Sequence, residues 1–343
     1  MTLREALVNI VHNTDICVQH GPMLLDGGFG TMVQRYGLKE EDFRGYRYRN
    51  HPCMLLGNNE ILTLTRPDVV SEIHKAYIQA GAQIITTNTF SANTISQADY
   101  QCQHLVDEMN TQAVHIAREA FLQLGVEGFV IATAGPTNKS LSISPDINDP
   151  ACRAISFDQL AESYIQQMRV QIEAGADAIM LETIFDTLNA KAGIYAHQEA
   201  VEQTGKEIPL MLSATVNDTM GRLLSGQTIE AFLISVSHAQ NLLSVGLNCS
   251  FGADDMLPVL RTLRRAVDKT LNERGQCFVS CHPNAGLPNS MGQYDVNPEQ
   301  FAYSVKPMIQ EGLADIIGGC CGTTPEHILA LANHIKANYQ LCR

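Results

Sequence analysis

The chain has 343 residues, 45% of them hydrophobic and 17% charged, which is ordinary for a globular protein. Its formal net charge of −13 argues against nucleic acid or an anionic membrane as a partner. No apolar run reaches the roughly 18 residues of a membrane span, and the N-terminus lacks the pattern of a secretory signal. Ten cysteines without an export signal indicate a reducing, cytoplasmic location, where thiols stay free or bind metal.

The first residues interleave charge with leucine and predict a short amphipathic helix. From residue 23 onward, short apolar runs alternate with helical patterns, and such runs suit parallel strands covered on both faces. The predicted strands span residues 23–25, 83–87, 129–133, 178–181, 210–214, 242–246, 277–280 and 315–317. The clearest helices are predicted over residues 69–80 and 160–172, where apolar residues recur at helical spacing before Gly81 and Gly175.

Eight strand–helix units without a break predict an α/β fold, a single (β/α)8 TIM barrel domain over residues 1–343. The alternative is an open, doubly wound sheet with helices on both faces. Two connections are long, residues 29–66 after strand one and residues 135–156 after strand three. Both leave the carboxyl ends of strands, where barrel enzymes build their active sites, so we expect them to form a rim or lid.

The most informative motif is Gly-Gly-Cys-Cys-Gly-Thr-Thr-Pro, residues 318–325. Adjacent cysteines rarely form a disulfide with each other, but they can place two thiolates on one metal ion. Cys320 and Cys321 follow strand eight and Cys249 follows strand six, so a barrel brings all three to one end. Three thiolates and one open position predict a catalytic zinc. The alternative is three buried free cysteines, and Cys281, near the end of strand seven, is a weaker candidate ligand.

Other polar residues share the carboxyl ends of the strands. They are Asp26, Gly27, Gly28, Asn88, Thr89, Glu182 and Asn284. Carboxylates at this end suit a substrate ammonium group, and backbone amides of the glycine loop suit a carboxylate, so the set predicts an amino acid pocket. For each residue the alternative is a hydrogen bond within the rim or a helix cap. His282 has the chemistry of a ligand or base, but a lone histidine is more often structural.

Three segments resemble the homocysteine S-methyltransferase family, whose fold is a (β/α)8 barrel: Leu25–Thr31, Gly246–Cys249 and Gly318–Pro325. Within it, further segments resemble the homocysteine-binding modules of cobalamin-dependent methionine synthases. These are residues 42–45, 57–59, 88–90, 144–146, 185–191, 221–226 and 283–289.

The resemblance implies zinc at Cys249, Cys320 and Cys321, with the sulfur of homocysteine as the incoming ligand. It also implies that Asp26 and Glu182 lie at the homocysteine end of the pocket, whereas Asn284 lies close to the metal.

The implied reaction is attack of the homocysteine sulfur on the methyl group of methylcobalamin, which gives methionine. Three cysteinates leave zinc with one net negative charge and a substrate thiolate adds a second, so the sulfur stays nucleophilic. In such enzymes a separate cobalamin-binding module carries the donor and a folate-binding module recharges it. Neither these nor a reactivation module fits within the 343 residues, so we expect a fragment, a module or one subunit of a larger enzyme.

Two alternatives remain open at the level of the sequence. One is a self-sufficient homocysteine methyltransferase that uses betaine or a sulfonium donor. The other is a zinc-stabilised module that binds an amino acid without catalysis, in which case removal of zinc would unfold the domain.

Overall fold

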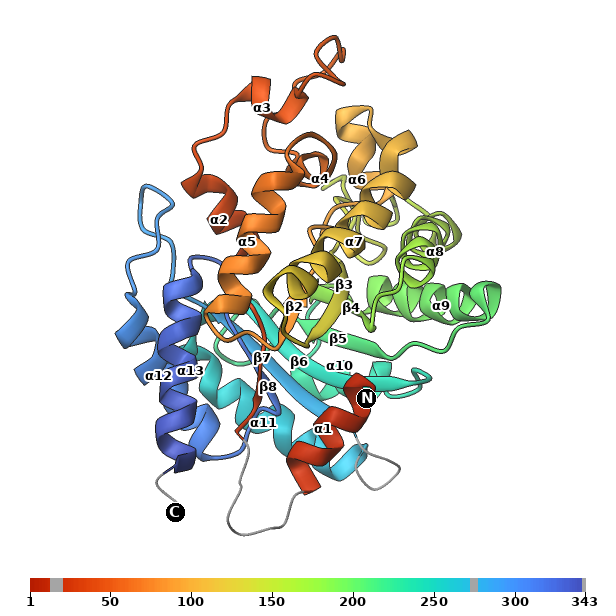
Figure 1. Ribbon diagram of the computed structural model, residues 1–343. Helices are drawn as coiled ribbons and strands as arrows, with labels where there is room; N and C mark the ends of the chain where they lie inside the picture. Colours follow the sequence, from red (N-terminus) through yellow and green to blue (C-terminus); the bar gives the residue numbers. More distant parts are fainter. Residues whose placement is uncertain (13–20, 272–276, 341–343) are drawn as a thin grey trace.

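The computed structural model describes residues 1–12, 21–271 and 277–340. Eight parallel strands form the wall of a (β/α)8 TIM barrel, surrounded by helices (Figure 1). The strands are β1 Met23–Leu24, β2 Ile84–Thr86, β3 Phe129–Ala134, β4 Ala178–Ile184, β5 Leu210–Ala214, β6 Leu242–Gly252, β7 Phe278–Asn284 and β8 Ile316–Ile317. The strand order is β1-β8-β7-β6-β5-β4-β3-β2.

The wall closes between β1 and β2, which excludes the open sheet. Gln83 N–H donates to the carbonyl of Leu24 (2.8 Å), and Asp26 N–H donates to the carbonyl of Ile84 (3.0 Å). The predicted barrel is therefore confirmed, and each predicted strand overlaps an observed one.

The helices lie between the strands and at the two ends of the barrel. They are α1 Leu3–His12, α2 Phe29–Arg35, α3 Glu40–Arg44, α4 Leu62–Thr65, α5 Pro67–Gln79, α6 Thr94–Gln97, α7 Val106–Leu124, α8 Phe157–Glu173, α9 Thr187–Thr204, α10 Ile229–Val236, α11 Ala253–Thr270, α12 Pro298–Gln310 and α13 Pro325–Gln340, with short 3-10 helices η1 Asn59–Ile61, η2 Ala98–Tyr100 and η3 Gln103–Leu105. Gly81 (φ 107°) and Gly175 (φ 93°) follow α5 and α8 in the conformation that glycine adopts past a helix end. Among the described residues, no helix is long and apolar enough to cross a membrane.

Apolar side chains form two layers, one on each side of the barrel wall. Along β4, Ala178 and Met180 belong to the interior cluster, whereas Ile179 and Leu181 belong to the outer cluster against the helices. The interior cluster also contains Leu3, Ala6 and Leu7 of α1, which lies at the lower end of the barrel in Figure 1. Helix α1 thus covers the amino ends of the strands, and the polar residues of the candidate site lie at the carboxyl ends.

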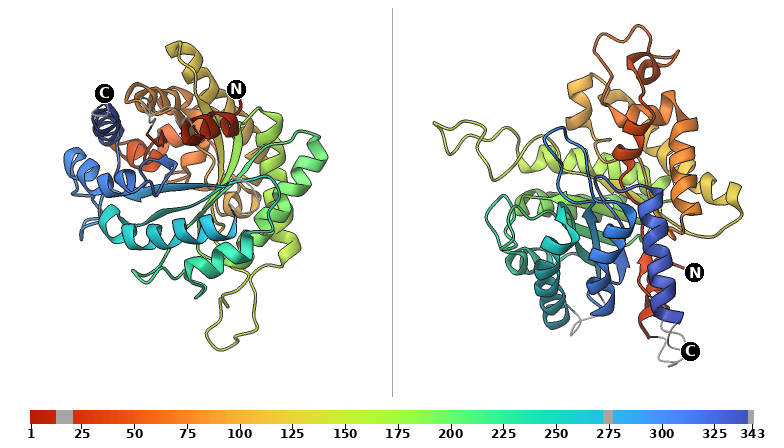
Figure 2. Two further views of the ribbon diagram at one scale, coloured as in Figure 1. Left: turned by 90° about the horizontal axis from the view of Figure 1, so that it is seen from below. Right: turned by 90° about the vertical axis from the view of Figure 1, so that its left-hand side faces the viewer.

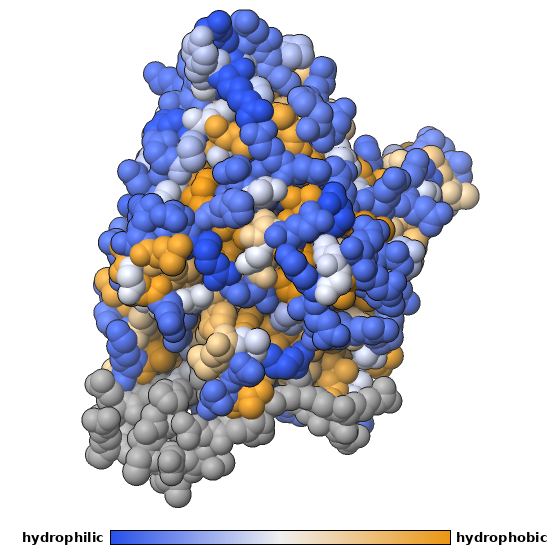
Figure 3. All heavy atoms as spheres, turned by 45° about the vertical axis from the view of Figure 1, so that its right-hand side comes forward, coloured by the Kyte–Doolittle hydropathy of each residue, from blue (hydrophilic) through white to orange (hydrophobic). Residues whose placement is uncertain are grey.

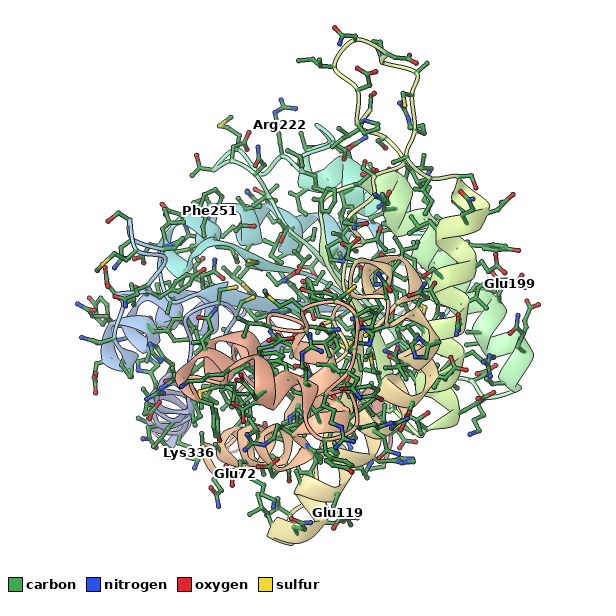
Figure 4. All side chains as sticks on the ribbon, turned by 90° about the horizontal axis from the view of Figure 1, so that it is seen from above. Glu72, Glu119, Glu199, Arg222, Phe251 and Lys336 are labelled. Atoms are coloured by element: carbon green, nitrogen blue, oxygen red, sulfur yellow. The ribbon has the colours of Figure 1, made fainter. Side chains whose placement is uncertain are left out.

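The two long connections lie at the carboxyl end, as the sequence predicted. Residues 29–66 carry α2, α3, η1 and α4 and stand above the barrel in Figure 1. Residues 135–156 contain no helix or strand and project far from the barrel (Figure 2, right). Asp186 holds the root of this loop, because its carboxylate accepts hydrogen bonds from the hydroxyls of Ser140 and Ser142, each at 2.6 Å. Seen from above, the same loop extends well beyond Arg222 and Phe251 (Figure 4).

Three strands run further than the apolar runs predicted, which changes where the site residues lie. Glu182 is within β4, Cys249 is within β6, and Asn284 is the last residue of β7, whereas the sequence placed all three just beyond a strand. Pairing continues through these polar residues, since Asn248 is opposite His282 and Cys249 is opposite Pro283. Polar side chains end an apolar run in the sequence, but they do not end the backbone ladder.

Candidate metal and substrate site

The three predicted cysteines meet at the carboxyl end of the barrel. Their sulfur atoms all lie within 4.8 Å of one another, and those of Cys249 and Cys321 are 3.9 Å apart. A tetrahedral zinc with Zn–S bonds of about 2.3 Å holds its sulfurs about 3.8 Å apart. The three sulfurs therefore fit one tetrahedral cation and leave its fourth position for another ligand.

The loop after β8 is fastened to the end of β7 by hydrogen bonds. Cys320 N–H donates to the carbonyl of Pro283 (2.8 Å), and Cys321 N–H donates to Oδ1 of Asn284 (3.1 Å). The hydroxyl of Thr323 donates to the carbonyl of Cys320 (2.6 Å). Two cysteines from one loop are thus held in fixed orientation with Asn284 beside them, and the closeness of Asn284 to a bound metal stays a prediction.

Gly27 and Gly28 let the loop after β1 approach this cysteine loop closely. A Cβ on Gly28 would lie 2.7 Å from the carbonyl oxygen of Cys320, and one on Gly27 would lie 2.7 Å from Oγ1 of Thr323. Gly28 N–H also donates to Oγ1 of Thr323 (2.9 Å). These glycines are needed for packing at the site, and a direct contact of either with substrate stays a prediction.

Cys249 is held in an unusual backbone conformation next to a buried asparagine. Cys249 and Thr183 both have φ 57°, a region that residues other than glycine rarely adopt. Asn248 is fully buried, and its Oδ1 accepts from Thr183 N–H (3.0 Å) and from the hydroxyl of Ser213 (2.7 Å). Its Nδ2 donates to Oγ1 of Thr183 (2.8 Å). Asn248 thus joins β4, β5 and β6 directly beneath Cys249, a role that the sequence analysis missed.

The sulfurs of the cluster share their protons unequally. Hydrogen bonds from the thiols of Cys320 and Cys321, with a further one from the Asn284 side chain, lower the pKa of Cys249 to about 2. The same interactions with Cys249 raise the pKa of Cys320 well above its usual value and that of Cys321 to about 11. One thiolate is therefore stabilised by its neighbours, but three together repel one another, and a bound cation removes that repulsion.

Two carboxyl groups lie in the barrel near the cysteines. Asp26 is buried, and its carboxylate accepts from Thr86 N–H (2.7 Å) and from the Thr86 hydroxyl (3.0 Å), while burial raises its pKa to about 7. Burial, followed by the charges of Asp26 and Cys249, raises the pKa of Glu182 to about 8. A positive charge between them favours both ionised forms. The pair therefore suits an ammonium group.

Asn88 and Thr89 use their side chains within the protein. Nδ2 of Asn88 donates to the carbonyl of Asn59 (2.7 Å) and to the hydroxyl of Thr63 (3.1 Å), which ties the connection after β1 to β2. Thr89 is fully buried and its hydroxyl donates to the carbonyl of Thr133 (2.7 Å). Both residues position the rim, and a substrate contact from either stays a prediction.

The weaker candidates from strand seven face opposite sides of the wall. The thiol of Cys281 points outward to the sulfurs of Met256 (3.3 Å) and Met308 (3.9 Å), and burial raises its pKa. It lies outside the cysteine cluster. His282 is buried on the interior side, where the charge of Cys249 acts on it.

Comparison with known proteins agrees with this geometry. A family model described as Homocysteine S-methyltransferase matches residues 23–335, which is most of the chain. The Escherichia coli homocysteine methyltransferase MmuM is similar in its oxidized and metallated forms, with a TM-score of 0.71 and 19% identity over 95% of this chain and 99% of that one. Its apo form gives a TM-score of 0.65 and 18% identity over 96% and 99%. Similarity at this identity shows the shared fold, and the family match goes further: the chain belongs to the homocysteine S-methyltransferase family and is a methyltransferase that acts on homocysteine.

Proposed function

We propose that this chain is the homocysteine-binding module of a methionine synthase, with one zinc ion held by Cys249, Cys320 and Cys321. The observation that carries the proposal is the spacing of three sulfurs around one tetrahedral position, beside an acid-lined barrel interior. Soft thiolate donors favour zinc over the hard cations that carboxylates prefer. A reducing cytoplasm keeps the three thiols available, and this is where we place the chain.

The residues around the cluster have separate tasks in this proposal. When bound, zinc lowers the pKa of the homocysteine thiol, so that its sulfur is nucleophilic at neutral pH. Asp26 and Glu182 take the α-ammonium group and thereby fix the direction in which the side chain of the substrate extends. Oδ1 of Asn284 accepts from the backbone N–H of Cys321 and so keeps that residue in place, and the side chain of Asn284 also donates to the sulfur of Cys249. The sulfur is thus oriented for in-line attack on a methyl group above the barrel.

We propose methylcobalamin, carried by a separate module, as the methyl donor. Exposed apolar side chains gather in the loops at the carboxyl end of the barrel, and a macromolecular carrier needs such a surface. They are Met54, Leu56, Phe90, Ile143, Ile147, Met220, Leu224, Leu287 and Met291. The face seen in Figure 3 is mostly hydrophilic with apolar patches between. Cobalamin-binding and folate-binding modules are therefore the partners we expect.

The test is methionine formation by the purified chain from homocysteine and free methylcobalamin, with zinc content measured on the same sample. We expect turnover that is lost on chelation and restored by zinc. Betaine and S-methylmethionine, run in parallel, address the self-sufficient alternative, and turnover with either of these alone would reject the cobalamin assignment. Cys53→Ala, a half-buried cysteine outside the cluster, is the matched control and should keep both zinc and activity.

The binding module without catalysis makes a different prediction about the metal. If zinc only stabilises the fold, chelation unfolds the chain and no donor supports turnover. We expect the chain to stay folded after chelation and the zinc-loaded chain to support turnover, because the two apolar layers of the barrel do not depend on Cys249, Cys320 and Cys321.

A further inference from the structure

Tyr294 lies beside the cysteine loop, although the sequence analysis did not single it out. It belongs to the connection between β7 and α12, residues 285–297, where it pairs with Pro288 in an isolated antiparallel bridge. Asn289 closes this hairpin, because its N–H donates to the carbonyl of Gln293 (2.8 Å) and its Oδ1 accepts from Gln293 N–H (3.0 Å). The backbone at Tyr294 is therefore held by contacts within its own connection.

The ring of Tyr294 packs on the backbone of Gly322, the residue that follows Cys321. A Cβ on Gly322 would overlap Cβ and Cγ of Tyr294 and would lie 2.7 Å from its Cδ1. Gly322 has φ 80°, a conformation that favours glycine, and its N–H donates to the hydroxyl of Thr31 (2.9 Å). A side chain at position 322 is thus excluded, and the aromatic ring occupies the space beside the cysteine loop.

The hydroxyl of Tyr294 reaches the sulfur of Cys321, and the two groups are hydrogen bonded. When Cys321 holds a metal its sulfur has no proton, so the phenol must be the donor and the thiolate the acceptor. The charges of Cys249 and Cys320 also act on this hydroxyl, which places it near the whole cluster. A hydrogen bond to a charged sulfur is stronger than one between neutral groups.

This bond supplies what the backbone contacts of Cys321 do not. The N–H of Cys321 donates to Oδ1 of Asn284 (3.1 Å), and its carbonyl accepts from the N–H of Ala285 (2.9 Å). These two contacts fix the peptide groups of Cys321 but leave the direction of its side chain undetermined. The Tyr294 hydroxyl acts on the sulfur itself and so selects that direction.

We propose that Tyr294 is a positioning residue of the metal centre, whose hydroxyl donates to the sulfur of Cys321 and keeps that sulfur directed at the bound cation. This inference rests on the zinc site of the proposed function and goes beyond it, because Tyr294 acts through a cysteine ligand. Contacts of this kind, one shell outside the ligands, typically change metal affinity by about tenfold to a hundredfold.

The test compares wild type with Tyr294→Phe, which keeps the ring on Gly322 and removes only the hydroxyl. Competition with a chromogenic chelator measures zinc affinity, which should fall by about tenfold to a hundredfold. Co²⁺ placed in the same site reports on the sulfurs through its thiolate-to-cobalt charge-transfer absorption. That band should move to longer wavelength in Tyr294→Phe, because a sulfur that loses a hydrogen bond gives up its electrons more easily.

Tyr303→Phe is the matched control, since it makes the same change at a tyrosine on α12 that is 74% exposed. It should keep the zinc affinity and the cobalt spectrum of the wild type. Far-UV circular dichroism of both variants should match the wild type, so that a change at the metal is not a change of fold.

The outcomes separate this inference from the proposed function. If Tyr294→Phe keeps both the affinity and the charge-transfer band, the assignment of Tyr294 is wrong, although the zinc site stands. A weaker affinity with an unmoved band also overturns it, because that result indicates packing of the loop and not a bond to the sulfur. A wild-type protein that binds neither zinc nor cobalt would refute the proposed function, and the role of Tyr294 with it.

Discussion

Replacement of Asn248 by alanine tests whether this buried amide sets the geometry of the site. The substitution removes three hydrogen bonds, of 3.0, 2.7 and 2.8 Å, that join β4, β5 and β6. It leaves Thr183 N–H and the hydroxyls of Thr183 and Ser213 without that partner. At about 1 kcal/mol for each bond, the free energy of unfolding should fall by about 3 kcal/mol. Domains are stable by about 5–15 kcal/mol, so the variant should still fold.

The same change should loosen the metal site. Cys249 keeps its left-handed conformation (φ 57°) next to a residue that no longer anchors it, and loss of such outer contacts typically costs about 10–100-fold in metal affinity. Urea unfolding followed by circular dichroism measures the first effect, and competition with a chromogenic chelator measures the second. Asn138→Ala, which removes one exposed hydrogen bond to Asp99, is the control and should shift stability by less than about 0.5 kcal/mol. An Asn248→Ala protein with the wild-type urea midpoint and zinc affinity would refute this reasoning.

Four further outcomes are expected. Cys320→Ala and Cys321→Ala should each abolish zinc binding and methyl transfer, as measured by metal analysis and methionine formation, while the far-UV circular dichroism spectrum stays that of a barrel. Chelation of the wild type should leave that spectrum unchanged as well, so a large loss of helical signal would indicate a structural metal. Asp186→Asn should weaken the bonds at the root of loop 135–156 and make it more sensitive to limited proteolysis, with protection equal to wild type counting against the anchor. Burial lowers the pKa of His74 to about 4 from about 6.5. The stability that the neutral His74 contributes is therefore present above pH 6.5 and is lost as the pH falls toward 4, at up to about 1.4 kcal/mol per pH unit. His74→Leu should flatten that decline, as measured by urea midpoints from pH 7 to 4.

The barrel could be predicted from the sequence because its buried strands appear there as runs of apolar residues. Apolar runs such as Leu210–Ala214 mark strands covered on both faces, and β5 has those bounds. The cysteine cluster could be predicted too, since residues at the carboxyl ends of β6 and β8 must meet once a barrel is assumed. What failed was the length of β4, β6 and β7, because strand pairing is a property of the backbone and the polar residues at the ends of these strands conceal it.

The contacts that support the site could not be predicted from the sequence, because they join residues that are far apart in the chain. Asn248 precedes a cysteine in a short motif, and nothing in that motif reveals that its amide bonds two other strands. His282 looked like a lone histidine until the alternation along β7 showed its side of the wall. Asn248 has no local pattern, because its importance comes from partners far away in the chain.

The placement of the cysteines in the chain has a consequence for how the molecule is made. Cys249 lies on β6, but Cys320 and Cys321 belong to the final strand–helix unit, and their loop packs on Gly28 from the first, 295 positions before Thr323. A chain that is still being synthesised therefore lacks two of its three sulfurs until the eighth strand–helix unit emerges. Because the first and last units must be joined before the three sulfurs meet, metal capture reports a completed barrel, and a protein interrupted before residue 320 has no means of holding the ion.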